Sequence, residues 1–297
     1  VCPCLSQAVG TANACGGTTG YVWDEVACNA ANSAPTPTPA PSTPNTPTGG
    51  GVSADPHGMS IGGGKWDFRG KDDTSFALWA AEKLHVNGMT KERTFKKKGG
   101  QVVHGSYFSR ISFTAVTEGS ITEGSITVYA EVRAEQPGSF RFYLDATGPY
   151  ANRTSVELPG VSLSVTPKKE LVVHTPNVET RAKWKQLLMP LNAAGEPVPK
   201  DDPSRWYLDT SFRALNTTMP AVAPHGLIGQ SFDGSKLTVH GKQDNYGRGR
   251  LFKTSAQAEG AIEGTYLDYI VAGPFATSFK FSRFGVHTPV APRNVAA

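Results

Sequence analysis

Two long stretches of the sequence alternate apolar and polar residues, and this alternation limits the fold more than any other feature. They are Gln101–Val116 and Ser125–Arg133. In the second stretch, the apolar residues that share one face are Ile126, Val128, Ala130 and Val132. A period of two residues is the side-chain repeat of a β-strand, because successive side chains point to opposite faces. The sequence therefore predicts long strands with one buried face.

Shorter stretches of similar character are separated by glycine and proline turns. We expect further strands at Ser139–Asp145, Val161–Val165, Leu171–His174, Trp206–Leu215, Lys236–Gly241, Arg250–Thr254, Ala261–Val271 and Ser278–Phe284. The one helix we expect is Val178–Met189, which Pro190 would end, and a pair of strands is the alternative there. Many short strands joined by tight turns predict an all-β domain built as a two-sheet sandwich.

Between Asn32 and Gly51, proline recurs at every second or third position. Proline fixes φ and lacks an N–H group, so this linker is expected to be polyproline II and neither helix nor sheet. Interleaved serine and threonine are typical of an O-glycosylated stalk, and an undecorated spacer is the alternative. The expected O-glycosylation sites are Ser33, Thr36, Thr38, Ser42, Thr43, Thr46 and Thr48. Prolines that hydroxylation would make into further glycosylation sites are Pro35, Pro37, Pro39, Pro41, Pro44 and Pro47.

The linker divides the chain into parts. We expect a cysteine-bearing segment at 1–31, the linker at 32–51, a β domain at 52–285 and a C-terminal tail at 286–297. The chain opens on Val1 without a methionine or a signal sequence, so we interpret it as a mature secreted chain.

The four cysteines all lie in the first segment, at Cys2, Cys4, Cys15 and Cys28. An even number so close together predicts disulfide bonds formed in an oxidising, extracellular compartment. A Cys2–Cys4 bond would be strained, so each of the two is expected to pair with Cys15 or Cys28, in either arrangement. A zinc site is the alternative, although the spacing lacks the usual paired knuckles.

Composition argues against several classes of protein. Apolar residues make up 38% and charged residues 18% of the chain, which is typical of a globular protein. No apolar run approaches the roughly 20 residues that cross a bilayer, so we expect no membrane insertion. The tightest basic run, Lys96–Lys98, precedes two glycines and predicts a solvated hairpin tip. Contact with nucleic acid or an acidic glycan is the alternative there, and no nucleic-acid partner is expected.

Two stretches far apart in the sequence resemble the two ends of one known module. Ser53–Gly70 reads SADPHGMSIGGGKWDFRG, and Pro224–Gly234 reads PHGLIGQSFDG. They resemble the G-D-P-H and F-D-F-x-G motifs that begin a von Willebrand factor type D-like module, and the G-L-x-G-x-F-D-G motif that closes it. Leu84–Gly88 resembles a motif of plant root-cap proteins, and Ala258–Phe284 is similar to the ending of secreted modules of algae and other protists. The resemblance covers residues 53–284 and implies a secreted β module, although this domain lacks the cysteines of animal members.

The resemblance implies that the bond between Asp55 and Pro56 can cleave itself, as it does in some of these modules. A neighbouring His57 would carry the proton. Ala54 stands where the motif has glycine and restricts φ, so a fixed turn held by His57 is the alternative.

The resemblance also implies a calcium ion near the first hairpin. Asp67 and Asp233 lie in the matching motifs, and both supply the oxygen ligands that calcium prefers. Other oxygen donors of this kind are Asp72, Asp73, Asp244 and Asn245. Aspartates that stabilise turns are the alternative.

Two N-glycosylation sequons begin at Asn152 and Asn216, and both are expected in loops. The sequence has no G-x-S-x-G, H-E-x-x-H or phosphate-binding loop, so we do not expect an enzyme. A pair of glycosidase carboxylates, remote in sequence, is the enzymatic alternative.

These patterns favour a secreted structural glycoprotein of a filament, matrix or cell-surface appendage. Its partners would be other copies of itself and its covalently attached glycans, with the N-terminal segment docking on the next β domain. The alternative is an extracellular carbohydrate-binding or adhesion module with Trp66, Trp79 or Trp206 as exposed sugar platforms.

Overall fold

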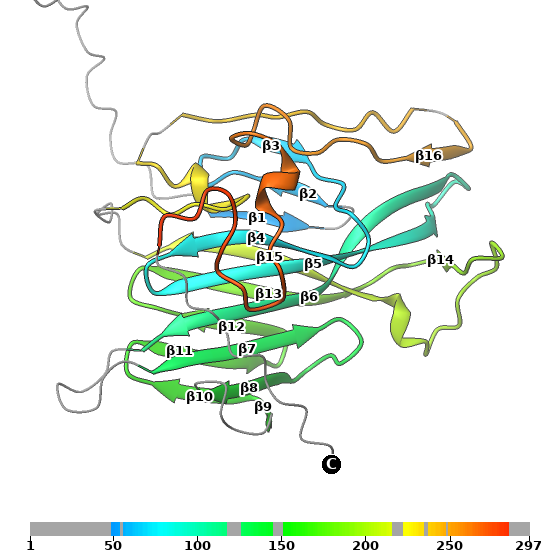
Figure 1. The fold of residues 1–297 in the computed structure, drawn as a ribbon. Helices are drawn as coiled ribbons and strands as arrows, with labels where there is room; N and C mark the ends of the chain where they lie inside the picture. The colour runs from blue at the N-terminus through cyan, green and yellow to red at the C-terminus, as the bar shows by residue number, and fades with distance from the viewer. Residues whose placement is uncertain are drawn as a thin grey trace, which may run out of the picture. The chain divides into compact units, whose positions relative to one another are not determined.

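The computed structural model describes residues 49–53, 56–117, 126–144, 151–215, 222–234, 237–247 and 249–284. The chain divides into two units, 1–46 and 47–297, and all described residues belong to the second. Within these ranges the protein contains sixteen strands and three short 3-10 helices, and no α-helix (Figure 1). The prediction of an all-β domain is confirmed.

The strands follow the chain from end to end. They are β1 (Gly50–Ser53), β2 (His57–Met59), β3 (Lys65–Asp67), β4 (Thr74–Ala81), β5 (Leu84–Lys96), β6 (Val102–Val116), β7 (Thr127–Arg133), β8 (Phe140–Leu144), β9 (Ala151–Arg153), β10 (Ser155–Leu158), β11 (Val161–Thr166), β12 (Glu170–His174), β13 (Val178–Gln186), β14 (Pro190–Leu191), β15 (Trp206–Ala214) and β16 (Leu251–Lys253). The 3-10 helices are η2 (Pro203–Arg205), η3 (Gly229–Ser231) and η4 (Tyr266–Tyr269).

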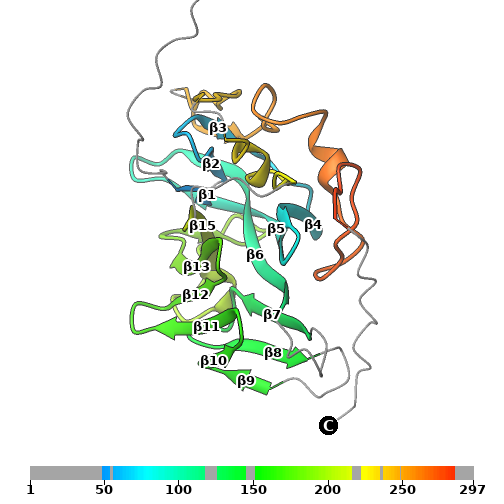
Figure 2. The same ribbon diagram turned by 90° about the vertical axis from the view of Figure 1, so that its left-hand side faces the viewer.

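Hydrogen bonds join all these strands into one sheet, whose main path runs β10-β11-β12-β13-β15-β6-β7-β8-β9. The two ends of this path are consecutive in sequence, since only Thr154 separates β9 from β10. The sheet therefore curls until its two end strands come near each other without pairing, and it is nearly closed into a barrel-like shape (Figures 1 and 2). This curvature corrects the prediction of a two-sheet sandwich, because no clear separation into two sheets is present.

The expected helix at Val178–Met189 is wrong, because β13 occupies most of it. Thr180, Ala182 and Trp184 are buried at every second position, which is a strand period. β13 pairs with β12 on one side and β15 on the other, so it is a central strand of the sheet. Of the apolar residues that suggested a helix, Trp184 and Leu187 are buried, whereas Leu188 is exposed.

Three of the expected strands are also wrong. The described parts of Lys236–Gly241, Ala261–Val271 and Ser278–Phe284 are irregular, apart from the single turn η4. At the other end of the domain, β1 begins at Gly50, so the last two residues of the predicted linker belong to the sheet. A Cβ atom on Gly51 would lie 2.5 Å from the carbonyl oxygen of Thr210, which explains glycine there.

Aromatic side chains from β4, β15 and the segment after β3 fill the upper part of the core. Phe68 meets Phe76 edge to face at 5.1 Å between ring centroids, and Trp79 stacks on Phe212 at 5.4 Å. All four side chains are at most 2% exposed. Burying such rings contributes on the order of 2 kcal/mol each, so this cluster fixes β4 against β15.

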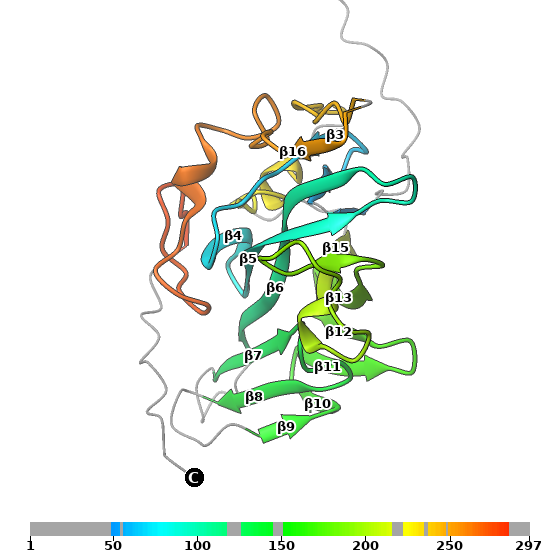
Figure 3. The same cartoon turned by 90° about the vertical axis from the view of Figure 1, so that its right-hand side faces the viewer.

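The outer edge of β4 is covered by segments from near the C-terminus, which Figure 3 shows beside it. Ala80 and His225 exchange two backbone hydrogen bonds of 2.7 and 2.8 Å, and Val271 N–H donates to the Ser75 carbonyl at 3.0 Å. These bonds satisfy backbone groups that would otherwise be buried without partners. The segment from 222 to 284 is therefore an integral part of the domain.

Gly226 allows this close approach, and its replacement gives the first prediction. Its φ is +104°, and a Cβ atom would lie 2.6 Å from the Leu78 carbonyl oxygen. We expect Gly226→Ala to lower the free energy of unfolding by roughly 3 kcal/mol in chemical denaturation. Gly99 has a φ of +105° but open space around it, so Gly99→Ala should cost only about 1 kcal/mol. Equal losses in the two variants would contradict the importance of the contact with β4.

The side chain of His225 is buried in the same contact. It is 1% exposed, and its ring packs against Tyr269 and Phe281. Burial lowers the pKa of His225 and the charge of Arg283 lowers it further, while the hydrogen bond from Nε2 to Glu263 Oε2 at 3.2 Å opposes both.

The second prediction concerns pH. Because the folded state holds the pKa of His225 below its unfolded value of about 6.5, the unfolded chain binds the proton more tightly. The free energy of unfolding should therefore fall as the pH drops below about 6.5, and this part of the fall should be absent in His225→Phe. Denaturation curves between pH 5 and 8 measure it, and identical pH slopes for the two proteins would refute the assignment.

Candidate functional site

The two motif stretches that the sequence analysis linked do lie together. The backbone N–H of Ile61 in the first stretch donates to Ser231 Oγ in the second at 2.9 Å. Phe232 of the second stretch packs on Trp79 of β4, with 6.0 Å between ring centroids. The chain that follows the second motif also runs along β3, where Asp67 N–H donates to the carbonyl of Lys242. The first and second motifs therefore form one wall of the domain.

Asp67, a predicted calcium ligand, has both carboxylate oxygens occupied. Oδ1 lies 2.7 Å from His57 Nδ1, and Oδ2 accepts the backbone N–H of Asp244 at 2.7 Å. Asp67 is 5% exposed, whereas Asp233 is exposed. In the described ranges, no three His, Cys, Asp or Glu side chains form a group that could hold a metal ion. Calcium stays a prediction, and the observed role of Asp67 is to join two segments of the chain.

The other aspartates of the predicted calcium set serve local structure. Asp72 Oδ1 accepts the backbone N–H of Glu92 at 2.6 Å, and Asp73 lies 3.3 Å from Lys91 Nζ. Asp244 Oδ1 accepts the backbone N–H of Ser255 at 2.9 Å.

Several other predicted sites lie partly or wholly outside the described residues. These are the four cysteines, all the O-glycosylation and hydroxyproline positions, Asn216, and Ala54 with Asp55. Asn152 is described and exposed, but it lies in the edge strand β9 and not in the expected loop. The predicted hairpin tip at Lys96–Lys98 is confirmed, since these residues lead into the turn between β5 and β6.

Two of the three proposed sugar platforms are wrong. Trp66 and Trp79 are 1% and 2% exposed. Trp66 packs against Gly58, where a Cβ atom would lie 2.4 Å from its ring, so it is a core residue. Trp206 is only partly buried, and Lys169 Nζ lies 5.1 Å from its ring centroid.

Trp206 belongs to a polar groove with two lobes, which we take as the candidate site. The lobes have volumes of about 390 and 310 Å³, and Arg93, Asp202 and Ser204 line both. One wall comes from β5 and β6, and the opposite wall comes from the loop that carries β14 and η2. Leu191 and Asn192 line the first lobe, and Trp206 closes the second.

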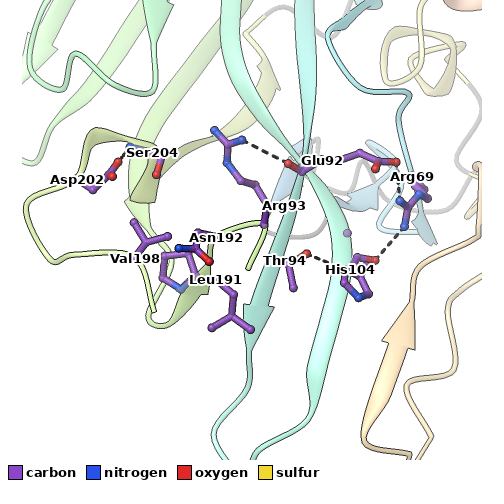
Figure 4. Close-up of a pocket in the computed structure, with 13 residues that line it drawn as sticks. Arg69, Glu92, Arg93, Thr94, His104, Leu191, Asn192, Val198, Asp202 and Ser204 are labelled. Atoms are coloured by element: carbon purple, nitrogen blue, oxygen red, sulfur yellow. Dashed lines mark hydrogen bonds and ion pairs between the residues drawn. The ribbon is translucent and has the colours of Figure 1, made fainter. Parts of the chain in front are cut away.

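Arg93 separates the two lobes. In Figure 4 its side chain lies between Glu92 and the Asp202–Ser204 pair. It donates one hydrogen bond of 3.3 Å, to the carbonyl of Glu92, and it forms no ion pair with any described residue. Burial lowers the pKa of Arg93, although Asp72, Asp73, Asp202 and Glu135 partly offset this effect. A half-buried guanidinium with unused donors is well suited to bind a ligand oxygen.

The groove wall beside Arg93 is held by a fixed network. Arg69 Nη2 lies 2.6 Å from Glu92 Oε1, and its Nη1 donates to the His104 carbonyl at 2.9 Å. Thr94 Oγ1 lies 2.7 Å from His104 Nδ1 (Figure 4). Because Glu92 pairs with Arg69, Arg93 has no carboxylate partner among the described residues.

The opposite wall is rigid as well. Arg205 donates to the carbonyls of Val198 at 2.8 Å and Leu188 at 2.6 Å, which ties the loop to itself. Asp202 Oδ1 accepts the N–H of Ser204 at 2.7 Å and caps η2. The groove is therefore preformed and needs little ordering to bind.

The groove can offer hydrogen-bond donors, acceptors and one aromatic face to a hydroxyl-rich ligand. No protein-family model and no curated protein matches this chain. Among the described residues, no helix is long and apolar enough to cross a bilayer.

Proposed function

We propose that this chain is a secreted structural glycoprotein that assembles with copies of itself into an extracellular filament, matrix or appendage. The chain consists of a cysteine-bearing segment, a proline-rich linker and a β domain. This order suits a subunit whose extended linker carries its N-terminal segment to a neighbouring subunit. The observation that carries the proposal is the exposed sheet edge at β9 and β10. In the part of the chain that the structure describes, each of these strands pairs on one side only.

Two other edges of the sheet are covered by the chain itself, although β16 also pairs on one side only in the described residues, with β6. β4 is paired by residues around His225 and Val271, and β3 by residues near Lys242. An uncovered edge offers free backbone groups to a strand from another chain, which is how β-strand addition works. The proposed occupant is the N-terminal segment of the next subunit.

The backbone of β10 gives this edge a direction. Val165 N–H donates to the Thr154 carbonyl, so Thr154, Val156 and Leu158 bond toward β11. The alternate residues Ser155 and Glu157 therefore point their N–H groups away from the sheet. A glycan on Asn152 would cover β9 and leave β10 for pairing.

The third prediction uses this direction. Glu157→Pro removes an outward N–H without touching the ladder to β11, so it should abolish self-assembly while leaving the monomer folded. Glu157→Thr keeps the N–H group and should assemble normally. Sedimentation and negative-stain imaging of the secreted full chain measure assembly. A full chain that stays monomeric, or a Pro47–Ala297 truncation that still polymerises, would refute the proposal.

A second function, carbohydrate binding or adhesion, is favoured by the groove. Arg93 has donors to spare between two polar lobes, and Trp206 supplies an apolar face on which a sugar ring can stack. This proposal moves the expected sugar platform from Trp66 and Trp79 to Trp206.

The fourth prediction tests the groove. On a glycan array, Arg93→Gln should weaken binding of the wild-type ligand by about tenfold, the loss of one charge-assisted hydrogen bond. Arg153→Gln removes an exposed arginine from β9 and should leave binding unchanged. No bound glycan, or equal effects of the two substitutions, would contradict this second function.

A further inference from the structure

A second depression, separate from the groove, lies at the turn that joins β5 to β6. It has a volume of about 620 Å³ and is open to solvent. We call it the basic cup, and its lining residues are Lys97, Lys98, Gly99, Gly100, Gln101, Gly247, Gly249 and Arg250. None of these residues is acidic, so the cup carries three formal positive charges and no negative charge.

The cations of the basic cup have no carboxylate partners among the described residues. Lys98 and Arg250 are exposed, and Lys97 places Nζ 3.5 Å above the ring of Tyr246. The flanking strands add two further exposed lysines, Lys96 and Lys253, which form no ion pair with any residue that the structure describes. Like charges held close together repel one another, and a bound anion relieves this repulsion.

Elsewhere on the domain, cations are commonly neutralised. Lys183 pairs with Glu170, Lys242 with Glu259 and Lys280 with Asp268. In the last two pairs, the lysine Nζ lies 3.0 Å from a carboxylate oxygen. The whole chain has a formal charge of +4, so the three charges of the basic cup are a concentrated part of a small total.

The basic cup is also held in shape without a ligand. Gln101 Nε2 lies 3.0, 3.2 and 2.8 Å from the carbonyl oxygens of Tyr246, Gly247 and Gly249. The N–H of Val102 donates to the Arg250 carbonyl at 2.8 Å and continues into the parallel pairing of β16 with β6. Both segments that carry the cations are thus fixed to each other, which lowers the cost of binding.

We propose that the basic cup binds a polyanionic polysaccharide through its sulfate or carboxylate groups. This proposal goes beyond the assembly proposed above and does not depend on it. A nucleic acid fits less well, because single-stranded nucleic acids stack bases on open aromatic rings. Here Lys97 covers one face of Tyr246, and Phe252 packs against the same ring at 4.6 Å. A shallow cluster of cations suits the repeated charges of a polysaccharide.

The test measures binding of the full chain to immobilised heparin, polygalacturonate and neutral dextran at several salt concentrations. We expect binding to one or both acidic polymers and none to dextran, with an affinity that falls steeply with salt. Lys98→Gln with Arg250→Gln should weaken binding on the order of tenfold and reduce the salt dependence. Lys97 is left in place because it packs on Tyr246.

The control removes two exposed lysines from other parts of the surface, as Lys168→Gln with Lys200→Gln. This double variant should bind like the wild type. Denaturation curves establish that both double variants are folded. The proposal is overturned if neither acidic polymer binds, if the two double variants lose equal affinity, or if duplex or single-stranded DNA binds as tightly as the acidic polymers.

Discussion

The covering of the β4 edge is the constraint on which the rest of the domain depends. β4 is buried on both faces, because every residue from Ser75 to Ala80 is buried. A buried strand cannot leave one edge unpaired, because each backbone group without a partner costs on the order of 1–3 kcal/mol. Residues near His225 supply the missing partners, so a late part of the chain completes a strand formed early in it.

This constraint explains what the sequence could and could not predict about the fold. The alternation in β6 and β7 is long enough to be read locally, because each strand pairs along most of its length. The tail around Tyr269 and Phe279 has similar apolar content, but those rings pack around His225 one by one without a ladder. Composition alone therefore does not distinguish a paired strand from an irregular segment with buried rings. The curl that brings β9 to β10 is likewise invisible locally, because it depends on the twist of the entire sheet.

The candidate sites also combine residues that the sequence can identify locally with contacts that depend on remote parts of the chain. The motif stretch identified Asp67, but its role depends on Asp244, which is remote in the sequence. Neither Arg93 nor Asp202 belongs to a motif that the sequence analysis identified. The pairing of β14 with β5 brings the loop that carries Asp202 to Arg93, and the groove lies between them. The Lys96–Lys98 run was visible as a tip, but the parallel strand β16 is what brings Arg250 to it.

The charges of the sheet surface explain why the basic cup stands apart. Glu131 is 1% exposed and lies within 3.6 Å of Arg110, Arg133 and Arg141, so three arginines share one buried carboxylate. Glu179 is similarly placed between other basic side chains. Such pairs weaken the field of the sheet beyond a few ångströms, whereas the cup's cations have no carboxylate partner in the part of the chain that the structure describes. In Figures 1 and 3, β16 and the β9–β10 edge lie at opposite ends of the domain. A polymer held at the cup would therefore leave β10 free to pair, so the proposed assembly and the proposed polysaccharide binding do not exclude each other.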